Sequence, residues 1–143
     1  MNLSDNFTLA EMIASPSAAK AGIDNTPDAA VIANLRRLCQ LLEAIRTLVD
    51  APLLISSGYR GPALNALIGG SPTSAHLRGL AADFTVVGLA PRQTVELIAD
   101  SGLVFDQLIL EFDRWVHLAV SERPPRREVL TIRKDTGYLP GIV

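Results

Sequence analysis

The sequence is poor in cysteine and has no long apolar run, which excludes disulfide-stabilised folds and membrane-spanning proteins. Its single cysteine, Cys39, cannot form an internal disulfide, and it falls in an apolar helical pattern. A cysteine in such a pattern is typical of a buried, unreactive side chain. No apolar run approaches the ~18 residues that a membrane-spanning helix needs. We therefore expect no integral membrane segment and a fold that is held together by packing.

Positive and negative charges are nearly balanced, with 13 basic and 15 acidic residues and a net charge of -2. This balance does not support a nucleic-acid partner or a role at an anionic membrane surface. The sequence also lacks a phosphate-binding loop and the Gly-x-Ser-x-Gly elbow of serine hydrolases. Residues 1–6 have neither the basic nor the apolar stretch of a secretory signal, which predicts a protein that is cytoplasmic as synthesised.

The chain length and the hydrophobic periodicity predict one α+β domain. A chain of 143 residues, 48% of them hydrophobic, can bury one substantial core. One apolar stripe has successive spacings of 4, 3, 4, 3 and 4 residues, and it consists of Val31, Leu35, Leu38, Leu42, Ile45 and Val49. This spacing predicts a core helix, with a coiled-coil seam as the alternative. Thr26 is the expected N-cap of this helix and Pro27 its first residue.

Shorter elements are expected on both sides of this long helix. Capping, proline and glycine patterns predict short helices over residues 8–14, 18–22, 62–68 and 91–100. Apolar runs predict strands at 53–56 (buried), 80–87, 105–112, 115–120 and 128–133 (an edge strand), with a loosely determined tail from Thr136. We expect an antiparallel sheet that carries the functional site, packed by one long and several short helices. The domain spans residues 1–143, with its core at about 7–133.

Two histidines and one aspartate stand out as candidate metal ligands. His76 and His117 are the only histidines, and Asp83 is the one charge in the apolar run 80–87. A carboxylate in a buried strand is costly unless it is paired or metal-bound. A catalytic zinc site takes three such ligands and leaves a fourth position for water or substrate. We predict a Zn²⁺ site; the alternative is that the histidines are hydrogen-bonded core or surface residues.

The motif around these ligands resembles a known family. Residues 74–84 follow the pattern Ser-x-His-x-x-Gly-x-Ala-x-Asp-Phe, preceded by Ser-Ser-Gly-Tyr-Arg at 56–60 and followed by Trp-Val-His at 115–117. This set resembles the zinc D-Ala-D-Ala carboxypeptidases, a family that includes phage and bacterial L-alanyl-D-glutamate endopeptidases and shares its fold with the hedgehog signalling domain. The resemblance runs from about residue 7 to 120. It implies Zn²⁺ as cofactor and peptidoglycan peptide as substrate.

Peptide hydrolysis also needs a general base, for which Glu111 is the first candidate. Glu111 precedes the hairpin that leads to His117, and relatives such as the hedgehog domain place a glutamate at about this distance. Many other relatives place the acid three residues before the last histidine, where this chain has Arg114. Asp113 is the alternative base. The alternative for both Glu111 and Asp113 is a solvated turn residue without a catalytic role.

Two further residues are expected to contact substrate. The guanidinium of Arg60 suits a substrate carboxylate or a developing oxyanion, and the resemblance implies that an arginine at this position contacts substrate. The alternative for Arg60 is a structural ion pair. The resemblance places Ser74 on the substrate side, and its alternative is a hydroxyl that caps the loop.

The residues and the resemblance together predict a zinc-dependent peptidase that cuts peptidoglycan stem peptides. It would be of the D-Ala-D-Ala carboxypeptidase or the L-Ala-D-Glu endopeptidase type, a phage-type lysis enzyme, and we expect a monomer. It would reach the cell wall after holin-type release or from a virion. The alternative is a non-catalytic, zinc-bearing binding or virion-structural domain of the same fold. A third option is an α+β domain that binds no metal.

Overall fold

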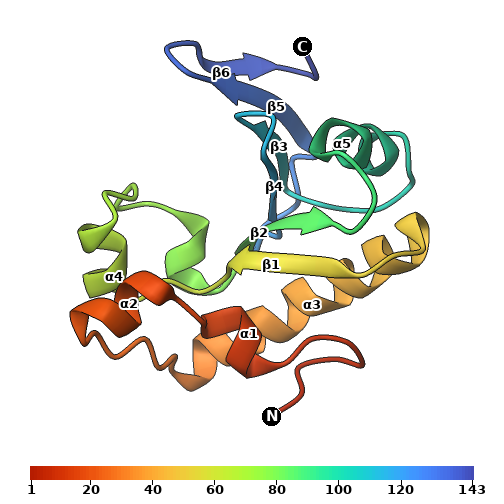
Figure 1. The fold of residues 1–143 in the computed structure, drawn as a ribbon. Helices are drawn as coiled ribbons and strands as arrows, with labels where there is room; N and C mark the ends of the chain where they lie inside the picture. Colours follow the sequence, from red (N-terminus) through yellow and green to blue (C-terminus); the bar gives the residue numbers. More distant parts are fainter.

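A computed structural model describes the whole chain, residues 1–143 (Figure 1). The chain forms five α-helices, one short 3-10 helix and six strands. The α-helices are α1 (Leu9–Ile13), α2 (Pro16–Ala21), α3 (Ala29–Val49), α4 (Pro62–Leu67) and α5 (Pro91–Ala99). The 3-10 helix, η1, spans Ala75–Arg78, and the strands are β1 (Leu53–Ser57), β2 (Ala81–Val86), β3 (Gln107–Glu111), β4 (Trp115–Ala119), β5 (Glu128–Arg133) and β6 (Gly137–Pro140). The predicted α+β class is confirmed.

The six strands form one sheet in the order β1-β2-β4-β3-β5-β6. All neighbouring strands are antiparallel except β3 and β5, which pair in parallel, so the sheet is mixed at this one position. The prediction that residues 128–133 form an edge strand is wrong, because β6 covers β5 and takes the edge itself. The tail that we expected to be loosely determined is therefore a strand. This strand begins with glycine and ends with proline, two residues that predict against a strand, but an edge position tolerates both.

The strand at the opposite edge also differs from the prediction. β1 was expected to be a buried strand, but its exposure alternates along the chain and the Leu54 side chain is 57% exposed. β1 is an edge strand with one neighbour, β2, and its Leu54 and Ser56 side chains face solvent. The helix α1 packs on β1 (Figure 1). The predicted capping box of α1, formed by Thr8 and Glu11, is confirmed.

The long helix α3 supplies the largest share of the core. Four residues of the predicted apolar stripe are fully buried: Leu35, Leu38, Leu42 and Ile45. The two end residues of the stripe, Val31 and Val49, pack against the same cluster. Cys39 is buried beside them, and burial raises the pKa of its thiol to about 12, as expected of an unreactive side chain. The prediction of a core helix is confirmed.

The start of α3 lies two residues later than predicted, because Asp28 and not Thr26 is the N-cap. The Asp28 carboxylate accepts a hydrogen bond from the backbone N–H of Val31 at 2.9 Å. Thr26 instead makes two hydrogen bonds to the Asp24 carboxylate, at 2.6 and 2.9 Å. A carboxylate is a strong N-cap acceptor and also favours the positive end of the helix dipole. Thr26 therefore belongs to a turn with Asp24, and the helix begins after Asp28.

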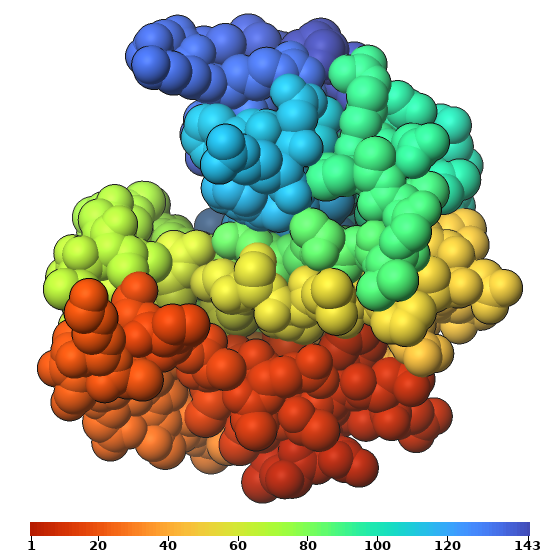
Figure 2. Space-filling view, in the orientation of Figure 1, coloured from red at the N-terminus to blue at the C-terminus, as the bar shows by residue number.

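The sheet has one covered face and one open face. Because side chains alternate along each strand, Leu108, Leu110, Val116 and Leu118 point to one side and are fully buried against the helices. The helices α3 and α5 contact the sheet on this side. Figure 2 shows the molecule hollowed on the other side, between the segment that follows β1 and the β5–β6 hairpin. No helix in the structure combines the length and the apolar character that crossing a membrane requires.

Candidate metal centre

The sheet register brings Asp83 and His117 together on the open face. Asp83 on β2 and His117 on β4 are direct antiparallel partners, so their side chains leave the sheet side by side. His76 comes from η1, whose first turn is capped by Ser74 and which ends at Gly79. Gly79 has φ +72°, and a Cβ there would lie 2.9 Å from the backbone carbonyl oxygen of Val31. This position therefore requires glycine, and the predicted sharp turn between the two ligands is confirmed.

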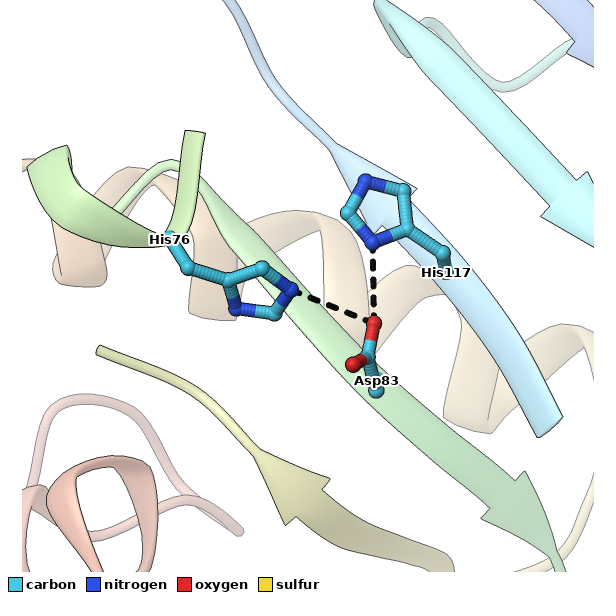
Figure 3. A group of neighbouring side chains, drawn as sticks. All are labelled: His76, Asp83 and His117. Atoms are coloured by element: carbon cyan, nitrogen blue, oxygen red, sulfur yellow. Dashed lines mark hydrogen bonds and ion pairs between the residues drawn. The ribbon is translucent and has the colours of Figure 1, made fainter. Parts of the chain in front are cut away.

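The three predicted ligands converge on one point (Figure 3). One donor atom from each of His76, Asp83 and His117 lies within 4.8 Å of the others. Asp83 Oδ1 is 2.8 Å from His117 Nδ1 and 3.3 Å from His76 Nε2. The His76 and Asp83 side chains are buried, and that of His117 is 12% exposed. Two imidazoles and a carboxylate at this spacing can hold a metal ion.

The tautomer of His76 is determined by its surroundings. Its Nδ1 lies 2.7 Å from the backbone carbonyl oxygen of Gly58. A carbonyl oxygen only accepts, so Nδ1 carries the proton and Nε2 of the neutral ring presents a lone pair. This Nε2 is buried and has no hydrogen-bond partner. A backbone carbonyl that orients the imidazole in this way is typical of metal-ligating histidines, so the His76 side chain fits a metal site.

Asp83 is held in its charged form. Burial by itself would raise the pKa of its carboxyl, but the hydrogen bond from His117 and the neighbouring His76 imidazole outweigh burial and lower that pKa below its usual range. Arg60 adds a further contact, with its Nη2 at 3.5 Å from Asp83 Oδ2. An ionised, buried carboxylate beside two histidines is suited to bind a metal ion.

Glu111 lies beside the three ligands, at the end of β3. Its Oε1 is 3.5 Å from His117 Nδ1, and its side chain is 16% exposed. Burial raises the pKa of this carboxyl, and the nearby Asp83 carboxylate raises it further, although His117 and Arg60 act in the other direction. A raised carboxyl pKa is a property of general bases that work near neutral pH. The predicted base therefore lies in the cleft, in a suitable electrostatic environment.

The alternative base, Asp113, lies elsewhere. It occupies the tip of the β3–β4 hairpin with φ +57° and does not line the cleft. Both of its carboxylate oxygens bind the Arg133 side chain, at 2.8 and 3.0 Å. Its side chain is 52% exposed. This geometry favours Glu111 over Asp113.

Arg60 and Ser74 both line the cleft, and each also has an internal partner. Arg60 Nε donates to the Ser57 hydroxyl at 3.1 Å, while its Nη2 faces Asp83. The Ser74 hydroxyl accepts a hydrogen bond from the backbone N–H of His76 at 3.2 Å. The structural ion pair and the loop cap, which were the alternatives for these residues, are thus both present. A role in substrate contact stays a prediction for each.

The ligands lie on the floor of a cleft of about 360 Å³. Its lining combines the η1 loop, the centre of the sheet and the β6 edge: Arg60, Ser71, Thr73, Ser74, Ala75, His76, Asp83, Asp106, Gln107, Ile109, Glu111, Trp115, His117, Ala119, Arg126 and Tyr138. Tyr138 was not expected in the cleft, because the sequence pattern assigns no element to the tail in which it lies. The contact of the Gly58 carbonyl oxygen with His76 was also not expected, because a glycine at this position predicts only a turn.

Comparison with known families agrees with this geometry. The model of a family described as Peptidase M15 matches residues 5–119. A search of curated proteins found no match. The matched stretch includes the three candidate ligands, Arg60 and Glu111, and it confirms the resemblance to zinc D-Ala-D-Ala carboxypeptidases that the sequence motif indicated. The chain therefore belongs to the Peptidase M15 family.

Proposed function

We propose that this protein is a zinc-dependent peptidase that hydrolyses the stem peptides of peptidoglycan. The observation that carries the proposal is the ligand set itself, with the unpartnered Nε2 of His76 buried beside the Asp83 carboxylate and His117. Membership of a peptidase family adds the reaction class. The phage-type lysis role is part of this proposal and rests on the sequence resemblance alone.

The donor set suits zinc better than the hard cations. Ca²⁺ and Mg²⁺ prefer sites built from oxygen atoms alone, whereas two of the three donors here are imidazole nitrogens. Three protein ligands leave one position free for water or substrate, as in catalytic zinc sites. When bound, zinc would acidify a water molecule and polarise the scissile carbonyl. His76, Asp83 and His117 would hold it.

The other residues of the cleft have separate tasks. Glu111 takes the proton of the attacking water and delivers it to the leaving amine, for which its raised pKa suits it. Arg60 anchors a substrate carboxylate or stabilises the developing oxyanion, because its guanidinium projects into the cleft beside Asp83. Ser74 borders the cleft at the start of η1, where its hydroxyl can meet the substrate backbone.

The surroundings of the cleft favour the endopeptidase type over the carboxypeptidase type. At Arg60 the cleft adjoins a hollow of about 240 Å³ that extends toward α2 and α4. At Thr73, Ala75 and Asp106 it adjoins another of about 360 Å³. We expect a longer peptide to continue past the metal centre along these hollows, which share lining residues with the cleft. A carboxypeptidase needs a cleft that ends just beyond the scissile bond.

A half-buried carboxylate in the cleft, that of Glu111, favours catalysis over the non-catalytic alternative. Partial burial of Glu111 beside Asp83 disfavours its charged form and raises its pKa, which costs free energy when it is ionised. A domain that only binds or assembles gains nothing from this arrangement. In an enzyme the cost supports proton transfer, and destabilised polar groups are common at active sites.

Digestion of purified Gram-negative peptidoglycan tests the proposal, with and without a zinc chelator and with mass spectrometry of the fragments. We expect chelator-sensitive release of fragments cut after L-alanine. Loss of a single terminal alanine would instead identify a carboxypeptidase. Unchanged fragments with zinc stoichiometrically bound would refute a peptidase role and leave the zinc-bearing binding or virion-structural domain.

A further inference from the structure

The C-terminal β5–β6 hairpin contributes Tyr138 to the lining of the cleft, although it lies outside the residues that match the family. The match ends at residue 119, and β5 and β6 follow it. Tyr138 on β6 pairs with Ile132 on β5, which in turn pairs with Glu111 on β3. Directly paired residues share one face of a sheet, so Tyr138 lies on the same face as Glu111. It is one of the residues that line the cleft.

The phenol of Tyr138 is both accessible and influenced by the site. The residue is 59% exposed, so a bound molecule can reach it. Partial burial raises the pKa of its hydroxyl, and the carboxylates of Glu111 and Asp83 raise it further, with no contribution from a hydrogen bond. An acid whose pKa is raised keeps its proton at neutral pH. Tyr138 therefore offers an O–H donor to a ligand in the cleft.

Two other donors that line the cleft, near the start of β3, already have partners, whereas the indole N–H of Trp115, which pairs with Glu111, is buried without one. Arg126 lines the cleft, but its guanidinium binds both carboxylate oxygens of Asp106, at 3.2 and 2.8 Å. The Gln107 amide donates to the Glu128 carboxylate at 2.9 Å. A stem peptide presents carbonyl and carboxylate oxygens, which need donors when they leave water. Tyr138 can supply one.

We propose that Tyr138 is a substrate-contacting residue, whose hydroxyl donates a hydrogen bond to a carbonyl or carboxylate oxygen of the stem peptide where the peptide passes over Glu111. The inference rests on the proposed function and extends it, because it makes the β5–β6 hairpin part of the substrate site. We expect the contact to fall on a substrate oxygen that does not take part in the reaction. It therefore strengthens the binding of substrate and transition state equally, which affects KM and leaves kcat unchanged.

Binding measurements separate this inference from the proposed function. In a Glu111→Gln background, calorimetry measures the Kd of a synthetic Gram-negative stem tetrapeptide for the zinc-loaded protein. Adding Tyr138→Phe, which removes only the hydroxyl, is expected to raise Kd about 3- to 10-fold, the effect of one neutral hydrogen bond. Lys134→Ala, at the exposed turn of the same hairpin, is the control and should leave Kd unchanged. In the wild-type background, Tyr138→Phe should raise KM by the same factor.

Two results would overturn the inference. If Tyr138→Phe binds the peptide as tightly as its parent, the hydroxyl makes no contact. If only Tyr138→Ala weakens binding, the ring packs against substrate and the donor role is wrong. Neither result affects the proposed function, which fails only if the wild-type protein with zinc bound releases no peptidoglycan fragments.

Discussion

Replacing Gly58 with alanine would test how the N-terminal helix α1 supports the metal centre. A Cβ at position 58 would overlap the backbone carbonyl oxygen of Met12 and lie 3.0 Å from its carbonyl carbon. These are backbone atoms of a fully buried residue, so no flexible side chain can move aside. The same Met12 carbonyl accepts a hydrogen bond from the N–H of Tyr59 at 2.8 Å. Relief of the overlap therefore separates α1 from this segment.

The expected cost combines overpacking with the loss of that hydrogen bond. Overpacking of a well-packed interior costs about 1–3 kcal/mol, and a backbone hydrogen bond contributes about 1 kcal/mol. We expect Gly58→Ala to lower the free energy of unfolding by about 2–4 kcal/mol. For a chain of this length the middle of that range corresponds to a fall in Tm of roughly 10 °C. A domain of ordinary stability, about 5–15 kcal/mol, would remain folded.

Urea unfolding of the metal-free protein measures this cost, with the fluorescence of Trp115 as the signal. Trp115 is the only tryptophan, so the signal reports one position. Gly102→Ala is the matched control, because a Cβ at Gly102 meets no atom within 4 Å. Equal stabilities of the two variants, within about 0.5 kcal/mol, would refute the steric argument.

The same substitution should also weaken metal binding. The Gly58 carbonyl oxygen orients His76 through the 2.7 Å contact to Nδ1, and it moves when the segment moves. Loss of such an outer-shell partner typically lowers metal affinity about 10- to 100-fold. Competition for zinc against a chelating dye measures the change. Unaltered zinc affinity in a destabilised Gly58→Ala variant would show that the carbonyl does not orient the ligand.

Three further predictions concern the site. Glu111→Gln should lower hydrolysis about 10²- to 10⁴-fold with zinc retained, while Asp113→Asn keeps activity; the opposite pattern would exchange their roles. In the metal-free protein, Glu111→Gln should raise Tm at pH 7. The pKa of Glu111 is raised above 4.5 in the folded state by burial, so its ionisation costs stability as pH rises through that pKa. The gain should vanish in thermal scans below pH 4.5, and a lower Tm at pH 7 would contradict it. His76→Ala should abolish stoichiometric zinc after dialysis, and full retention of metal would remove His76 from the ligand set.

Features that depend on neighbours within a few residues could be predicted from the sequence. The capping box of α1 and the apolar stripe of α3 are local patterns, and both formed as expected. The ligands could be predicted for a different reason, because a chain with two histidines and one charge in its most apolar strand leaves little choice. Antiparallel pairing of β2 with β4 then placed Asp83 opposite His117.

Features that depend on distant segments could not be predicted in this way. Only the tertiary structure places β5 parallel to β3, adds β6 at the edge and brings Tyr138 to the cleft. The steric demand on Gly58 comes from a carbonyl 46 positions earlier, which no local pattern reveals. The sequence by itself determined the ligand chemistry, because it depends on residue type. The structure decided which side chains surround the ligands, because strand order and close backbone contacts arise only when the whole chain packs.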